Sequence, residues 1–248
     1  MEERQPHYIL ENEYLRVEIG LDETGERPGY FVRRMARPAS KMSQVLLEGR
    51  PGREFVTRAG SIAAAECDVR RLPDGTWTAI LSGKADGWIA REILVLPPDR
   101  PYLKREQTYR FIRNMTTAIC PGFALPVADD LTYAFGSHPS ARMSSQLQPR
   151  RIAADDIASL PFHVWHSDGC VAIYGLDKRF SPGTLDFAPG SSELGATLSV
   201  YYPDKAGTDT GTGQAPDEIF LPVGTAVTLT EIIAARPLAH GEEPLLEA

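Results

Sequence analysis

Histidine and tryptophan alternate in one short stretch of the sequence, His163-Val164-Trp165-His166. On a β-strand, His163 and Trp165 would share one face, while Val164 and His166 would share the other. An imidazole can exchange a proton near neutral pH, and an indole can pack against the apolar C–H face of a sugar ring. The stretch therefore predicts His163 as a catalytic acid or base, with Trp165 and His166 as substrate-binding residues. The alternative is a core tryptophan beside a histidine at the end of a strand.

A second candidate for proton transfer is His138, which lies in the loop-like stretch Phe135-Gly136-Ser137-His138-Pro139. Functional groups gather in such loops. Asp129-Asp130 precede it, and in a close pair of carboxylates the pKa of one partner rises, which makes a usable acid or base. We therefore predict His138 and Asp129 as catalytic residues. The alternative for the two aspartates is an acidic turn exposed to solvent.

Three polar residues, Arg105, Gln107 and Tyr109, occupy alternate positions and would share one face of a strand. Guanidinium, amide and phenol groups suit the orientation of a ligand rich in hydroxyl or carboxylate groups. We therefore predict that these three residues bind substrate. The alternative is a cross-strand charge ladder without a ligand, completed by Lys104 and Glu106.

The element that must position these three residues is a central hairpin, Trp88 to Asn114. Its turn, Pro97-Pro98-Asp99-Arg100-Pro101, is too rich in proline to belong to either strand. The run before the turn is apolar enough to be buried, whereas Tyr102 to Ile112 carries polar groups on both faces. This mixture predicts that one face of the second strand lines a wet, hydrogen-bonding cleft.

The rest of the chain predicts further strands and almost no helix. Leu15, Val17 and Ile19 alternate with charged residues as in a half-buried strand, and Pro73-Asp74-Gly75 is typical of a hairpin turn. Thr116 to Val127 contains Pro121 and Pro126, which favours a sheet edge or a covering loop. The only plausible helix lies within Gln148 to Leu160, at Ala153 to Ser159. We therefore predict an all-β, antiparallel sandwich of two large sheets, with at most one or two short helices, formed by residues 1–248 as a single domain.

Composition narrows the classes of partner. The chain has 248 residues and a net charge of −7, without a dense basic cluster, which argues against nucleic acid. It has three widely spaced cysteines and neither a signal-peptide core nor an apolar stretch as long as a membrane span. We therefore expect a cytoplasmic protein without a membrane partner that could form a homo-oligomer. A metal held by His138, His163 and His166 is disfavoured because the last two face opposite ways. No cofactor is expected, because epimerisation and β-elimination need only proton transfer.

Three stretches resemble parts of a known fold: ILENEYLRVEIG (residues 9–20), REILVLPPDRPYLKREQTYRFIRN (91–114) and DEIFLPVGTAVTLTEIIAA (217–235). They are similar to the opening strand pair, the central hairpin and the closing strand pair of the galactose mutarotase-like β-supersandwich. Aldose epimerases share this fold with sugar-binding domains of some glycosidases and polysaccharide lyases. The resemblance covers most of the chain in order and spacing, and it implies this supersandwich.

The resemblance also implies a catalytic histidine just after the strand that ends in Asn114, and a glutamate base shortly before the closing pair. This sequence has Met115-Thr116-Thr117 at the first place, and Thr208 to Gln214 at the second contains Asp209 but no glutamate. The departures argue against mutarotase chemistry itself.

We therefore expect a carbohydrate-active enzyme that performs cofactor-independent acid/base chemistry, an epimerisation or a β-elimination, on a sugar, a sugar acid or an oligosaccharide. The alternative is a non-catalytic carbohydrate-binding or subunit-assembly module of the same fold.

Overall fold

The computed structural model describes residues 7–24, 28–36, 45–48, 55–57, 59–119, 122–125, 132–135, 143–144, 151–152, 162–166, 170–176, 181–187, 196–201 and 218–237. For residues 45–48, for those between 122 and 201, and for several positions near the end of the last strand, the description is confined to the backbone. Within these ranges the regular structure is β-strand, every strand pairing is antiparallel and no helix occurs. The predicted all-β class is confirmed.

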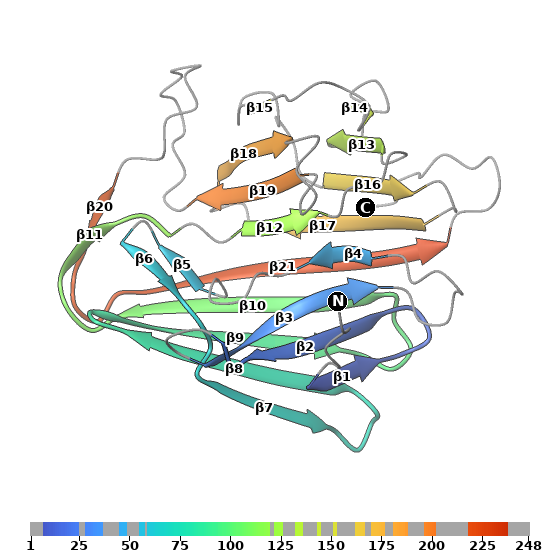
Figure 1. The fold of residues 1–248 in the computed structure, drawn as a ribbon, viewed down its shortest axis with the longest axis horizontal. Coiled ribbons are helices and arrows are strands. Elements are labelled where there is room, and N and C mark those ends of the chain that lie inside the picture. Colours follow the sequence, from blue (N-terminus) through green and yellow to red (C-terminus); the bar gives the residue numbers. More distant parts are fainter. Residues whose placement is uncertain are drawn as a thin grey trace.

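Two large sheets make up the fold (Figure 1). The first has eight strands, in the order β1 (Tyr8–Glu11), β2 (Arg16–Asp22), β3 (Gly29–Ala36), β4 (Val45–Glu48), β12 (Gly122–Leu125), β19 (Ala196–Tyr201), β18 (Ser181–Phe187) and β15 (Arg151–Ile152). The second has nine, in the order β14 (Met143–Ser144), β13 (Thr132–Phe135), β16 (Phe162–His166), β17 (Cys170–Leu176), β21 (Ala226–Pro237), β10 (Tyr102–Phe111), β9 (Trp88–Leu96), β8 (Trp77–Ala85) and β7 (Glu66–Arg71). Two small sheets pair β5 (Phe55–Thr57) with β6 (Gly60–Ile62) and β11 (Met115–Thr117) with β20 (Ile219–Leu221).

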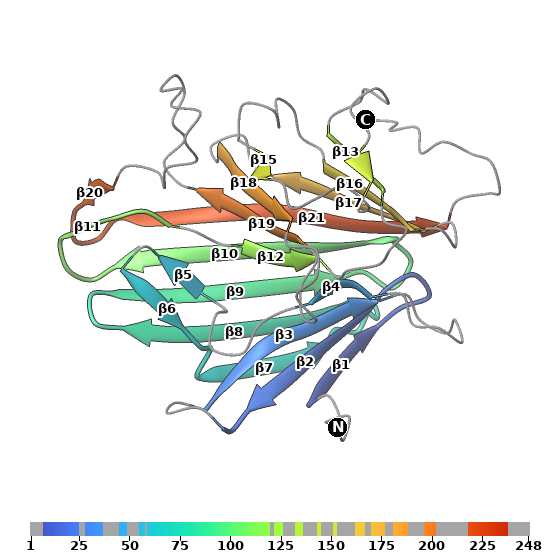
Figure 2. The same ribbon diagram turned by 45° about the horizontal axis from the view of Figure 1, so that its top comes forward.

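The closing strand β21 joins the two halves of the nine-stranded sheet. It pairs with β10 along one edge and with β17 along the other. Strands β7 to β10 follow one another by hairpins on one side of it, and β13, β14, β16 and β17 lie on the other side. The last long strand of the chain is therefore a central strand of the sheet, and Figure 2 shows it running beside β10 over most of its length.

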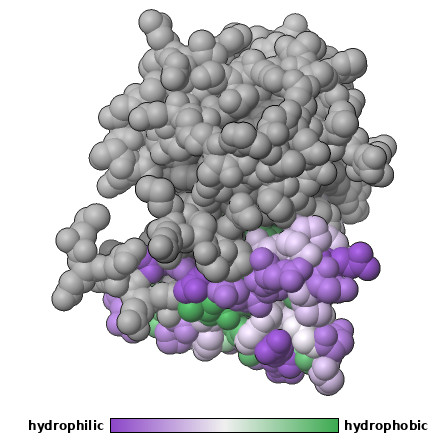
Figure 3. Space-filling view, turned by 90° about the vertical axis from the view of Figure 1, so that its right-hand side faces the viewer, coloured by the Kyte–Doolittle hydropathy of each residue, from purple (hydrophilic) through white to green (hydrophobic). Residues whose placement is uncertain are grey.

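The core lies between the two sheets. In Figures 1 and 2, β1 to β3 lie across β7 to β9, and the buried residues of both layers form one cluster. The first sheet contributes Leu10, Leu15, Val17, Ile19, Val32 and Met35, and the second contributes Leu81, Trp88, Leu94, Leu96, Leu103, Tyr109, Phe111, Val227 and Ile233. On the side shown in Figure 3, hydrophilic residues cover most of the described surface.

Two strand predictions need correction. In β2 and just before it, the predicted alternation holds for Leu15, Val17 and Ile19, which are buried, but Glu18 on the other face is fully buried too, so the strand is not half-buried with its charges outside. The Glu18 carboxylate accepts a hydrogen bond from Arg16 at 2.9 Å. Within the proline-containing stretch 116–127, β12 is not an edge strand, since it lies inside the eight-stranded sheet between β4 and β19. The predicted helix, Ala153 to Ser159, lies outside the described residues, and Arg151–Ile152 just before it forms strand β15.

Asn12 connects the opening strand pair to the turn of the central hairpin. Its Nδ2 donates hydrogen bonds to the carbonyl oxygens of Pro97 at 2.7 Å and Arg100 at 2.9 Å. Its Oδ1 accepts hydrogen bonds from the backbone N–H groups of Tyr14 and Leu15, each at 2.8 Å. One side chain therefore closes its own turn and holds the proline-rich turn of β9 and β10 against it.

Asn114 makes a similar connection at the other end of the hairpin. Its Oδ1 accepts a hydrogen bond from the backbone N–H of Val223, in the turn between β20 and β21, at 2.9 Å. The three stretches that resemble the mutarotase-like fold are thus joined in space by two asparagines, Asn12 and Asn114.

Replacing Asn12 by alanine should lower the free energy of unfolding by about 2 kcal/mol, because it removes the donor for two turn carbonyls and the acceptor for two N–H groups. Urea unfolding followed by tryptophan fluorescence measures the loss. The matched control is Asp74→Ala, since among the described residues Asp74 bonds only to the backbone N–H of Thr76, within its own exposed turn. Equal effects of the two variants would contradict a role for Asn12 in joining the two turns.

Candidate functional site

The central hairpin presents two different faces. Along β10, burial alternates strictly from Tyr102 to Tyr109. Arg105, Gln107 and Tyr109 share the face that packs into the core, where they are 6%, 1% and 0% exposed. Lys104 and Glu106 lie on the outer face, where they pair at 3.5 Å. The prediction that one strand carries polar groups on both faces is confirmed, but the three predicted ligand residues occupy its buried face.

Glu92 of β9 is the centre of a buried polar network. Its Oε1 accepts hydrogen bonds from Arg105 Nε and from Gln107 Nε2, the latter at 3.3 Å. Gln107 Oε1 accepts a hydrogen bond from the Tyr109 hydroxyl at 3.3 Å, and that hydroxyl accepts one from Val56 N–H at 3.4 Å. We call Glu92, Arg105, Gln107 and Tyr109 the buried network.

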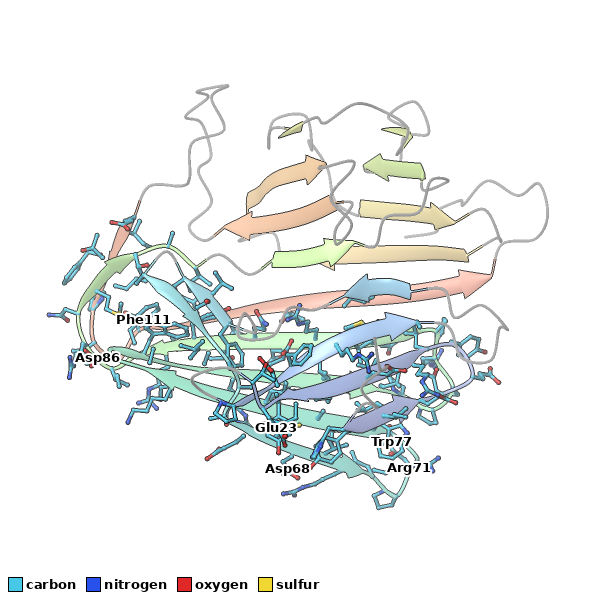
Figure 4. All side chains as sticks on the ribbon, viewed as in Figure 1. Glu23, Asp68, Arg71, Trp77, Asp86 and Phe111 are labelled. Atoms are coloured by element: carbon cyan, nitrogen blue, oxygen red, sulfur yellow. The ribbon has the colours of Figure 1, made fainter. Side chains whose placement is uncertain are left out.

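Aromatic rings enclose one end of the buried network. The Tyr109 ring lies 5.8 Å from the Trp88 ring and meets the Phe55 ring edge-on at 6.2 Å. Figure 4 labels Phe111, the last residue of β10, at the same end of the hairpin. Glu92 Oε2 is buried and has no hydrogen-bond partner among the described residues. The network is therefore enclosed by the core, and substrate contact by Arg105, Gln107 and Tyr109 stays a prediction.

Glu92 is not one of the site residues predicted from the sequence. The sequence does indicate it: Glu92 is a carboxylate inside the apolar run Ile89 to Leu96, and on a strand it shares a face with Trp88 and Leu94. A carboxylate in such a position needs a partner when it is buried. The register supplies one, because Glu92 lies opposite Gln107 and diagonal to Arg105. On the other side of β10, the register places Arg105 directly opposite Glu231 of β21.

The histidine and tryptophan candidates lie in the same sheet, three strands from β10. His163, Trp165 and His166 belong to β16, for which the structure describes only the backbone. His163 pairs with Ile173 of β17, which pairs with Ala234 of β21, which in turn pairs with Tyr102 of β10, so these four positions form one row across the sheet. The positions of His163 and Trp165 therefore belong to the face of the sheet that carries Lys104 and Glu106, not to the face that carries Arg105. His138 and Asp129 lie outside the described residues.

The place where the resemblance implies a histidine is occupied by a packing residue. Met115 is half-buried at the start of β11, and its Sδ lies against Gly87 in the turn between β8 and β9. Gly87 has φ +106°, and a Cβ there would come within 2.7 Å of the sulfur.

Asp209, at the second departure, lies outside the described residues. In the described part of the chain, no group of three His, Cys, Asp or Glu residues could hold a metal ion. No helix there has the length and hydrophobicity to span a lipid bilayer.

Comparisons with solved structures identify the fold. No family model matches the sequence, and no curated protein matches it either. A putative aldose 1-epimerase from Escherichia coli K12 superposes with a TM-score of 0.51 at 11% identity, over 93% of this chain and 99% of that chain. The chain has the galactose mutarotase-like fold. An alpha-galactosidase from Lactobacillus brevis contains the same supersandwich, with a TM-score of 0.53 at 11% identity over 93% of this chain and 39% of that one.

A larger protein contains the supersandwich as about half of its length. A TPR-domain containing protein from Parabacteroides distasonis matches with a TM-score of 0.61 at 10% identity, and the match covers 97% of this chain but 49% of that chain. The fold thus occurs both as almost a whole protein and as one part of a longer one.

Replacing Arg105 by alanine should lower the free energy of unfolding by about 3–5 kcal/mol, because it leaves the Glu92 carboxylate buried without its cation. Denaturant unfolding of Arg105→Ala, Glu92→Leu and the double variant measures the coupling between the two charges. We expect the double variant to be more stable than Arg105→Ala. The control is Lys104→Ala on the outer face, whose exposed pair should contribute at most about 1 kcal/mol. If Arg105→Ala cost no more than Lys104→Ala, the buried network would not stabilise the sheet.

Proposed function

We propose that the protein is a carbohydrate-active enzyme that performs cofactor-independent acid/base chemistry, an epimerisation or a β-elimination, on a sugar or sugar acid. The observation that carries this proposal is the match to the putative aldose 1-epimerase over 93% of this chain and 99% of the other. The match supports the proposal by analogy of fold, since a shared fold can host different chemistries. Both reactions require only proton removal and proton donation, which side chains can perform unaided.

The residues proposed for proton transfer are His163, His138 and Asp129. An imidazole near its ordinary pKa serves both as base and as acid at neutral pH. Trp165, two residues after His163, would provide the surface on which the sugar ring packs. His166, whose position alternates with those two, is proposed as a further polar contact at the end of the strand. The positions of His163 and Trp165 in the register favour the face of the nine-stranded sheet that carries Lys104 and Glu106.

The buried network has a supporting role in this proposal. Arg105, Gln107 and Tyr109 lie on the opposite side of β10 from Lys104 and Glu106. They form the floor beneath the outer face and hold β9 and β10 in place. A rigid floor favours catalysis because it keeps groups above it within a small range of positions.

The second candidate function is a non-catalytic carbohydrate-binding or subunit-assembly module. Two observations favour it: the packing role of Met115 where the resemblance implies a catalytic histidine, and the occurrence of the fold as 49% of a TPR-domain containing protein. A module of this kind would keep sugar affinity without turnover.

A panel of neutral sugars and sugar acids distinguishes the two functions. We expect turnover by the wild-type protein, followed by proton NMR for epimerisation and by ultraviolet absorbance of the unsaturated product for β-elimination. His163→Ala should lower kcat by a factor of about 10²–10⁴ while the sugar still binds, because it removes a proton-transfer group. The control is His7→Ala, an exposed histidine just before β1 that the proposed site does not use. Sugar binding by the wild type without any turnover would establish the non-catalytic module instead.

A further inference from the structure

Three exposed cations form a triangle on the outer face of the nine-stranded sheet. Lys84, Arg91 and Arg110 come from the consecutive strands β8, β9 and β10, and each side chain is exposed. Ile89 is the centre of the triangle, because it lies opposite Lys84 on one side and opposite Arg110 on the other. Arg91 follows two residues after Ile89 and therefore shares its face. We call these three residues the cation cluster.

The cation cluster has no counter-charge in the described part of the chain. No carboxylate there lies within ion-pair distance of Lys84, Arg91 or Arg110. The carboxylates of the neighbouring strands and turns are already engaged: Asp86, labelled in Figure 4, pairs with Arg113 at 2.7 Å, Glu106 pairs with Lys104 at 3.5 Å, and Glu66 accepts a hydrogen bond from Ser82 at 3.0 Å. Among the described residues the cluster is therefore an uncompensated positive patch, on a protein whose net charge is −7.

The spacing of the cluster suits a single anionic group. Arg91 is diagonal to both Lys84 and Arg110, so their Cβ atoms lie about 7–8 Å apart, and Lys84 and Arg110 lie about 10 Å apart across two strands. Long lysine and arginine side chains can converge over these distances. Thr108 lies opposite Arg91 in the register, and its hydroxyl lies 3.0 Å from that of Thr228. Cations, hydroxyls and the apolar Ile89 thus adjoin one another on one face.

We propose that the cation cluster is a subsite that binds a carboxylate or sulfate group of an acidic oligosaccharide. The inference rests on the proposed carbohydrate function and specifies the class of ligand. Arginine binds carboxylate and sulfate-like groups through two parallel hydrogen bonds, which favours these groups over a neutral hydroxyl. Ile89, between the cations, would pack against apolar C–H groups of the same sugar residue.

If the cation cluster and His163 contact the same ligand, that ligand must be an oligosaccharide, because the two places are far apart on the sheet. His163 lies in the row of Tyr102, three strand spacings away, or about 14 Å across the sheet. Arg91 lies in the row of Thr108, six residues further along β10, or about 20 Å along the strand. A monosaccharide is too small to reach both places, whereas a chain of sugars can follow the sheet between them.

The test measures binding of three hexasaccharides by calorimetry: hexagalacturonate, a chondroitin sulfate hexasaccharide and neutral maltohexaose. We expect at least one acidic hexasaccharide to bind more tightly than maltohexaose. Arg91→Gln should weaken that binding about tenfold, the effect of one charge-assisted hydrogen bond. Raising the salt concentration from about 0.1 M to 1 M, which shortens the screening length from about 10 Å to about 3 Å, should weaken it as well.

The matched control is Arg70→Gln. Arg70 also lies on this face, on β7, but it pairs with Asp68 at 2.6 Å, and their hydrogen bond raises the pKa of Arg70. This variant removes one positive charge from the same sheet without touching the cluster, so it should leave the affinity within about twofold, as expected of an exposed and already paired charge. Thermal unfolding of both variants confirms that each is folded.

The outcomes separate the ligand class from the proposed function. Equal binding of maltohexaose and the acidic hexasaccharides, unchanged by Arg91→Gln, would overturn the anionic subsite and leave carbohydrate recognition standing. Absence of binding to every hexasaccharide and to the sugars of the turnover panel would overturn carbohydrate recognition itself. Binding of sulfate ion or of a single-stranded oligonucleotide as tight as that of the acidic hexasaccharides would also overturn the subsite, because the patch would then recognise charge alone.

Discussion

The buried contact between Glu92 and Arg105 fixes the register on which the rest of the structure depends. Charges placed in a core are costly unless they meet, so the sheet must align β9 and β10 such that these two side chains reach each other. A slip of one residue would turn Lys104 and Glu106 into the core and bring Arg105 out. The register of β10 then sets that of β21, and β21 sets β17 and β16. Toward β9 and β8, the same register fixes the pairing that brings Lys84, Arg91 and Arg110 together.

The two asparagines act on the same hairpin from outside the core. Asn12 holds the turn where β9 passes into β10, and Asn114 holds the chain where β10 ends. Both bond to backbone groups of segments distant in sequence, so they tie the opening and closing strand pairs to the hairpin. This explains why three short stretches, each weak alone, carry the resemblance to the mutarotase-like fold. Their common feature is that they contact one another.

Much of the fold could be predicted from local patterns, because turns and alternation act over a few residues. The Asp74-Gly75 turn, the proline-rich turn after β9 and the long closing strand are in this class, and Gly75 has the positive φ of +87° that such a turn requires. The place of β12 inside a sheet could not be predicted, because it depends on partners from β4 and β19 that are far away in the sequence. Burial of Glu18 could not be predicted either, because the alternation within one strand does not show what covers its second face.

The limits of prediction at the site have a similar cause. Alternation placed Arg105, Gln107 and Tyr109 on one face, but with polar groups on both faces it could not tell which face would be buried. That choice depends on β9, where Trp88, Ala90, Leu94 and Leu96 are buried and Arg91 is exposed. The cation cluster could not be predicted from the sequence either, because its members lie 7 and 19 residues apart and become neighbours only when β8, β9 and β10 pair as two hairpins.

The two faces of the hairpin are physically connected, since they share one backbone. Arg91 follows Ala90 and precedes Glu92, and Thr108 lies between Gln107 and Tyr109. The groups on the outer face therefore stand on strands whose inner side chains are hydrogen-bonded and packed against aromatic rings. A ligand on the outer face would meet side chains whose backbone is already fixed, so less conformational freedom would be lost on binding. The buried polar residues of β10 thus give the proposed site on the opposite side of this strand a fixed backbone.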